Sequence, residues 1–150
     1  MEYALTVPRG IYDQINRYYK EAEPGKPLAL LLTHIGVEGQ SCRFDITDFV
    51  SLNEPITGNS AGFLQSPALM DAIDRAMESG MGILHLYSYP DAQAQSFDPV
   101  DNINNRILFR IAYHYLPSGP HACAAFNGAS LIGKVWLRNL STAPMTINIA

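Results

Sequence analysis

The segment at residues 27–35 constrains the fold more than any other part of this sequence. It reads PLALLLTHI, a continuous apolar run that begins at Pro27 and is followed by Gly36. A run this short is typical of a β-strand, and its lack of polar alternation indicates burial on both faces. We therefore expect a central strand of a β-sheet here.

Three segments carry apolar residues at helical spacing, and we expect helices over residues 8–23, over residues 66–80 and from residue 98 onward. Pro8, Pro67 and Pro99 suit first-turn positions, and Gly80 suits a helix C-terminus. The expected buried stripes are Ile11, Ile15, Tyr18 and Tyr19 in the first helix, Leu69, Ile73 and Met77 in the second, and Ile103, Ile107, Leu108 and Ile111 in the third.

The remaining patterned segments favour strands. Residues 42–52 alternate between apolar and polar side chains, and residues 81–89, 122–126, 130–137 and 146–150 are short and β-rich. Residues 37–40 read as a hairpin turn. The chain shows no internal repeat or linker, so we expect one α/β domain of the α+β type over residues 1–150.

Composition excludes some classes of function. The apolar fraction is 47% and the formal net charge is −4, with no run of basic residues, which argues against nucleic-acid binding. No apolar stretch approaches the roughly 20 residues of a membrane span, and the N-terminus lacks a signal-peptide core. We expect a soluble cytoplasmic protein with Cys42 and Cys123 as buried thiols; a disulfide between them is the alternative.

Residues 85–101, HLYSYPDAQAQSFDPVD, are the most informative for chemistry. Strand alternation places His85, Tyr87 and Tyr89 on one face, and Asp98 and Asp101 share one side of the next helix. A catalytic zinc site needs three protein ligands, an open position for water and a nearby carboxylate base. The layout suits such a site, but most of the residue types do not.

This segment resembles the motif of the JAMM (JAB/MPN) metalloproteases. In that family a strand ends in His-x-His-Pro, a loop leads to Ser-x-x-Asp at a helix start, and an early strand supplies a glutamate base. Bacterial members associated with E1-like and E2-like enzymes often read His-Leu-His-Ser-His-Pro, where this chain has HLYSYP at residues 85–90 and then FDPVD at residues 97–101. The late GKVW at residues 133–136 also resembles the family's small-x-x-Trp ending.

The resemblance implies an MPN/JAB-like, cytidine-deaminase-like three-layer fold, with a central mixed sheet flanked by helices. It also implies that the catalytic machinery is degenerate. The matching positions are Tyr87 and Tyr89 for the zinc-binding histidines, Asp98 for the serine, Asp101 for the third ligand, and the region of Lys26 and Pro27 for the lost base. A phenol, with an unperturbed pKa of about 10, is a poor zinc ligand near neutral pH. We therefore expect no catalysis and no bound cofactor.

Each of these residues also has a structural interpretation. The tyrosines are strand-favoured aromatics that fill a vacated pocket, and the two aspartates stabilise a helix N-terminus by charge–dipole attraction. His85 is more often a satisfied core histidine than a lone ligand. We expect a hydrogen-bonded structural role for His34 within its strand.

Three functional hypotheses follow. The first is a non-catalytic JAMM-like module that binds a ubiquitin-like protein or its E1/E2-like enzymes and that pairs as a homodimer or as an MPN-type heterodimer. The second is a zinc-dependent isopeptidase or peptidase with a relocated site at His85, Asp98 and Asp101. The third is a purely structural subunit of a larger assembly.

Overall fold

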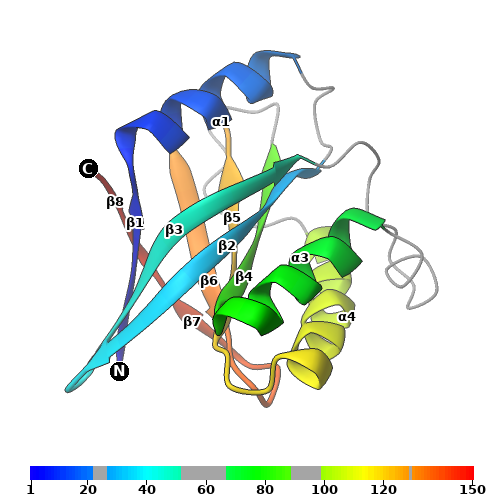
Figure 1. Ribbon diagram of the computed structural model, residues 1–150. Coiled ribbons are helices and arrows are strands. Elements are labelled where there is room, and N and C mark those ends of the chain that lie inside the picture. The colour runs from blue at the N-terminus through cyan, green and yellow to red at the C-terminus, as the bar shows by residue number, and fades with distance from the viewer. Residues whose placement is uncertain (22–26, 52–66, 89–98, 129) are drawn as a thin grey trace.

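The protein is a mixed α/β structure, and the computed structural model describes residues 1–21, 27–51, 67–88, 99–128 and 130–150. Within these ranges, three helices accompany a sheet of eight strands (Figure 1). The elements are β1 (Glu2–Val7), α1 (Arg9–Glu21), β2 (Pro27–Glu38), β3 (Ser41–Ser51), α3 (Pro67–Ser79), β4 (Gly82–Ser88), α4 (Pro99–Tyr115), β5 (His121–Phe126), β6 (Leu131–Trp136), β7 (Thr142–Pro144) and β8 (Thr146–Ile149).

The sheet has the strand order β7-β6-β5-β4-β2-β3-β1-β8 and is mixed. β1 runs parallel to both β3 and β8, β4 runs parallel to β5, and the other neighbours are antiparallel. β2 lies between β3 and β4, so the prediction of a central strand is confirmed. The chain passes from β7 to β8 through Met145 alone, so the sheet curves until its two outer strands meet at that residue.

Helices cover both faces of the sheet. Successive residues of a strand point to opposite sides, so one strand can contact helices on both faces. Leu84 belongs to the core on the side of α1, together with Ile15 and Phe44, whereas its neighbour Ile83 packs among the buried residues of α3 and α4. Figure 1 shows α1 on the opposite side of the sheet from α3 and α4. The motif strand β4 therefore presents one face to α1 and the other to α3 and α4.

The expected helices and five of the later strands are confirmed within one to three residues wherever the chain is described. β1 and β7 were not expected from the sequence, and two side chains expected in the core are exposed: Met77 is 54% exposed and Ile103 is 61% exposed. In both helices the buried stripe instead follows positions i, i+3, i+4 and i+7, and it uses small or polar residues that hydropathy alone passes over. The stripes are Leu69, Ala72, Ile73 and Ala76 in α3, and Asn105, Leu108, Phe109 and Ala112 in α4.

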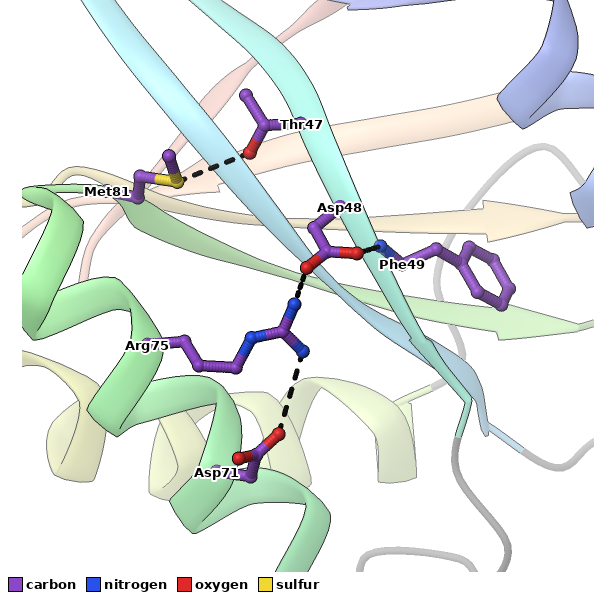
Figure 2. Close-up of polar contacts among 6 residues, drawn as sticks. All are labelled: Thr47, Asp48, Phe49, Asp71, Arg75 and Met81. Atoms are coloured by element: carbon purple, nitrogen blue, oxygen red, sulfur yellow. Dashed lines mark hydrogen bonds and ion pairs between the residues drawn. The ribbon is translucent and has the colours of Figure 1, made fainter.

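An ion pair joins α3 to β3 beside a bulge (Figure 2). Arg75 of α3 pairs with Asp48 and lies 3.6 Å from Asp71, one turn earlier in the same helix. The β2–β3 register shifts here, so that Thr47 is the extra residue of β3, and its hydroxyl lies 3.2 Å from the sulfur of Met81. Half-exposed pairs of this kind contribute about 0–1 kcal/mol to stability. We therefore infer that the main effect of the cluster is to orient α3 on the sheet.

Three further expectations can be compared with the structure. Cys42 and Cys123 are both buried and form no disulfide, which confirms the first interpretation of these residues. His34 is exposed rather than buried, because β2 continues past the end of β4, which pairs with it only as far as Thr33. None of the helices in the described ranges has the length and apolar character needed to cross a membrane.

Candidate functional site

The motif strand β4 directs two of the predicted site residues toward α4. His85 and Tyr87 share the face opposite Leu84 and Leu86, as strand alternation predicts, and their rings lie 4.2 Å apart between centroids. Both are buried, with exposed fractions of 1% and 3%. The structure thus places a histidine and a tyrosine side by side beneath a helix.

A buried asparagine on α4 connects these two side chains. The Tyr87 hydroxyl donates to Asn105 Oδ1 at 2.8 Å, and His85 Nδ1 lies 3.3 Å from the same oxygen. For His85 to donate this bond, Nδ1 must carry the ring proton, which leaves Nε2 with a free lone pair. Asn105 is fully buried. Sequence reasoning missed it, and the only available signal was an amide inside the apolar stripe of α4.

The cluster of His85, Tyr87 and Asn105, which we call the buried triad, is incompletely satisfied. Within the described part of the chain, His85 Nε2 and Asn105 Nδ2 are both buried and have no hydrogen-bond partner. A buried polar group without a partner destabilises a fold by about 1–3 kcal/mol. Most buried polar groups in proteins are paired. Among the described residues, Thr33 Oγ1 and Trp136 Nε1 also lack a partner, and the triad is where two such atoms lie in one cluster.

Burial keeps His85 uncharged. Loss of solvation lowers the pKa of His85 to about 4, and the hydrogen bond to Asn105 offsets only part of that decrease. Near pH 7 the side chain is therefore a neutral imidazole. A neutral imidazole with an unprotonated nitrogen is the form that binds metals, so the ring itself is chemically competent as a single ligand.

His121 shows how a structural histidine in this fold differs from His85. Its Nδ1 accepts a hydrogen bond from the backbone N–H of Ile83 at 3.1 Å, and its Nε2 lies 3.1 Å from the carbonyl oxygen of Leu116. Its ring stacks on Phe109, with an interplanar angle of 9°. Burial lowers the pKa of His121 to about 4 as well. Both ring nitrogens are paired, so His121 has a structural role, whereas His85 keeps one nitrogen unpaired.

A lysine supplies positive charge on the same side of the sheet. Cys123 of β5 pairs with His85 on one side and with Lys134 of β6 on the other. Lys134 donates a hydrogen bond to the side-chain oxygen of Asn102, which lies on α4 three residues before Asn105. Lys134 therefore places an ammonium group two strands from His85, on the side of the sheet that α4 covers.

The described residues do not fit a zinc ion. No group of three or more His, Cys, Asp or Glu side chains within them could hold a metal. The buried triad offers one imidazole nitrogen, a phenol that already donates to Asn105, and an amide, whereas a catalytic zinc site needs three His, Cys or carboxylate ligands.

Other predicted site residues can be placed only in part. Pro27, near the expected position of the lost base, pairs directly with Tyr87 across the β2–β4 ladder. The backbone of Asp101 lies in the first turn of α4, one helical turn before Asn105, and its side chain lies outside the described part. Lys26, Tyr89 and Asp98 also lie outside the described residues.

Comparison with known proteins adds no assignment to this geometry. The chain matches no protein-family model and no curated protein sequence.

Proposed function

We propose that this protein is a catalytically inactive relative of the JAMM metalloproteases that acts by binding another protein. The observation that carries the proposal is the hydrogen bond from Tyr87 to Asn105. At the position where the family's motif has a zinc-binding histidine, a buried phenol joins the motif strand to the following helix at 2.8 Å. The triad thus uses a ligand position for packing and hydrogen bonding.

The placement of the motif elements supports the MPN/JAB-like part of this proposal. The start of β2 lies beside Tyr87, β4 carries the degenerate histidine motif, and the first turn of α4 carries Asp101. The family's base, histidines and aspartate come from three elements in this same order. A mixed sheet with helices on both faces is compatible with the family's three-layer fold.

The binding role rests on what the resemblance implies for partners. Members of the family grip a ubiquitin-like tail as an added strand, and strand addition needs only backbone hydrogen bonds at an open sheet edge. Such binding survives the loss of a metal. We propose a ubiquitin-like protein, or the E1-like and E2-like enzymes that conjugate it, as the partner class in a bacterial conjugation pathway.

The test separates binding from cleavage in one sample. Ubiquitin carrying a fluorophore as a C-terminal amide is titrated with the purified protein, and both anisotropy and fluorophore release are recorded. We expect anisotropy to rise and release to stay at the level of a buffer blank. Release above that blank contradicts the inactive assignment, and no change in anisotropy at the highest protein concentration contradicts ubiquitin as a representative partner.

One observation favours a second function, a metal-dependent peptidase with a relocated site. His85 is neutral near pH 7 and its buried Nε2 has no partner among the described residues, so it is available as a ligand. Under this hypothesis, Asp98 and Asp101 complete the metal site. If His85→Ala leaves both metal content and peptide cleavage unchanged, this second function is wrong.

Restoring the histidines tests whether the resemblance has the correct register. The double variant Tyr87→His and Tyr89→His is expected to bind about one zinc ion per chain, because two imidazoles and the Asp101 carboxylate make a three-ligand set. Zinc content is measured by mass spectrometry of the dialysed protein. The matched control is Tyr87→Phe with Tyr89→Phe, which removes the same phenols without adding a ligand and is expected to bind none. Equal zinc in both variants contradicts the register.

A further inference from the structure

The tip of the β2–β3 hairpin leaves one edge of β2 without a neighbouring strand. β3 pairs with β2 as far as Glu38, but the ladder between β2 and β4 ends where Thr33 meets Gly82. Residues 34–38 therefore have a strand on one side only within the described part of the chain. Figure 1 shows this hairpin extending beyond the end of β4 and the C-terminus of α3.

The turn geometry identifies which backbone groups face outward. Gly39 and Gln40 form a two-residue turn with Gly39 at φ 60°, and Glu38 pairs with Ser41 across it. In such a hairpin the pair flanking the turn is hydrogen-bonded, and hydrogen-bonded pairs alternate with non-hydrogen-bonded pairs. The N–H and C=O groups of Ile35 and Val37 consequently point away from β3, toward the open side.

The sequence at this edge is complementary to itself. Residues 34–38 read HIGVE, and antiparallel pairing of two copies about Gly36 places His34 opposite Glu38 on one face. On the other face, the same pairing places Ile35 opposite Val37. Opposite-charge or hydrogen-bonding pairs and β-branched pairs at directly opposed positions each stabilise antiparallel strands. The backbone hydrogen bonds are compatible with this pairing, since Ile35 and Val37 would form the hydrogen-bonded pairs and their N–H and C=O groups face outward.

The surroundings of this edge also suit an apolar contact. Val37 is 62% exposed, which leaves a β-branched side chain in water at the hairpin tip. A hollow of about 290 Å³ lies next to Ile35 and is lined largely by apolar residues, including Met77, Met81 and Leu116. Val37 of a second copy, placed opposite Ile35, would lie at the mouth of this hollow.

We propose that two copies of the chain associate through this edge, with residues 34–38 of β2 paired antiparallel about a two-fold axis at Gly36. The contact is isologous, so each copy supplies the same surface and the assembly closes at two. The sheets of both copies then join into one continuous sheet. This surface lies at the far end of β2 from Pro27 and the buried triad, so it does not depend on the proposed function.

Charge exchange across the axis tests the register. His34→Glu puts two carboxylates opposite each other at two symmetric places, and Glu38→Lys removes the acceptor opposite His34 at the same places. Each variant alone is expected to weaken the dimer about tenfold. The double variant His34→Glu with Glu38→Lys places opposite charges at both pairs and is expected to recover at least the original affinity. Association is measured by sedimentation equilibrium of the full chain from low micromolar to near-millimolar concentration.

A cysteine on the axis gives a second, independent measurement. A Cβ atom added at Gly36 would have no neighbouring atom within 4 Å, so the Gly36→Cys variant is expected to fold. In the proposed pairing the thiols introduced at this position in the two copies would face each other across a non-hydrogen-bonded pair, with Cα atoms about 4.5 Å apart and within disulfide range. Mild oxidation is therefore expected to link Gly36→Cys into covalent dimers. The matched control His34→Cys places the two thiols about 13 Å apart and is expected to stay monomeric on a denaturing gel.

The sedimentation and cross-linking results together support or overturn the proposed pairing. Rescue by the double charge variant together with selective cross-linking of Gly36→Cys supports the pairing. A protein that stays monomeric and shows no cross-link at Gly36→Cys overturns it. A dimer that is indifferent to all three charge variants uses another surface and also overturns it, and so does equal cross-linking of His34→Cys.

Discussion

Acidifying the protein from pH 7 to pH 4 is expected to lower the free energy of unfolding by about 6 kcal/mol through two histidines alone. Burial lowers the pKa of His85 and that of His121 to about 4, from an ordinary value of 6.5. Each pKa unit corresponds to about 1.4 kcal/mol, so each histidine contributes roughly 3 kcal/mol. Since small proteins are stable by only about 5–15 kcal/mol, the fold should be close to unfolding at pH 4.

The sign follows from proton binding. Between pH 6.5 and pH 4 both imidazoles are protonated in the unfolded chain and neutral in the folded one, so the unfolded state binds more protons. Stability therefore falls as the pH decreases through this window, and the histidine contribution stops changing below about pH 4. Urea denaturation at closely spaced pH values between 7 and 4 measures the slope directly.

A matched variant separates the histidines from the carboxylates. His85→Gln keeps a hydrogen-bonding side chain of similar length at the triad but does not titrate. The free energy of unfolding of this variant should depend on pH less steeply than that of the wild type, and the difference is the contribution of one histidine. Carboxylate contributions are common to both proteins and cancel in the comparison. Identical slopes would show that His85 does not change protonation on unfolding, and would contradict its burial as a neutral ring.

Replacing Asn105 by alanine is expected to destabilise the protein by about 3 kcal/mol. The change removes the acceptor that the Tyr87 hydroxyl and His85 Nδ1 share, and it leaves a small cavity beneath α4. Thermal or urea unfolding near pH 7 measures the loss. Tyr87→Phe should cost about 1 kcal/mol in the wild type and much less in the Asn105→Ala background, because the phenol has then already lost this acceptor.

Asn102→Ala is the control for this experiment. Asn102 lies on the same helix, is half-buried and accepts a hydrogen bond from Lys134. The substitution removes an amide of the same size from the same element, but outside the buried triad. We expect a loss below about 1 kcal/mol. Equal losses for the two asparagines would contradict the central place of Asn105 in the site.

The sequence predicted the elements whose signals are local. The apolar run of β2, the helix spacing and the turn residues are each contained in a few neighbouring positions, and the three helices in the described ranges lie where expected. β1 was missed because its place depends on parallel pairing with β3 and β8, which lie far away in the chain. The exposure of His34 likewise depends on where β4 ends.

Strand alternation predicted one part of the site, the residues that share a face of β4. Alternation placed His85 and Tyr87 on one face, and their ring contact confirms this. It could not reveal Asn105, because a polar residue in an apolar stripe is buried only when a partner element supplies its hydrogen bonds. Here β4 provides them from 18 and 20 residues away. The roles of Tyr89, Asp98 and Asp101 remain predictions from the motif.

The zinc content of the wild-type protein tests the central claim most directly. The protein would be produced in zinc-supplemented medium, purified without chelators or a metal-affinity tag, dialysed, and analysed by inductively coupled plasma mass spectrometry against a protein-concentration standard. Under our proposal the hydrogen-bonded phenol of Tyr87 takes the place of a zinc ligand, so the protein should retain almost no zinc. About one zinc ion per chain that is retained through dialysis and lost in His85→Ala would show instead that the metal centre persists.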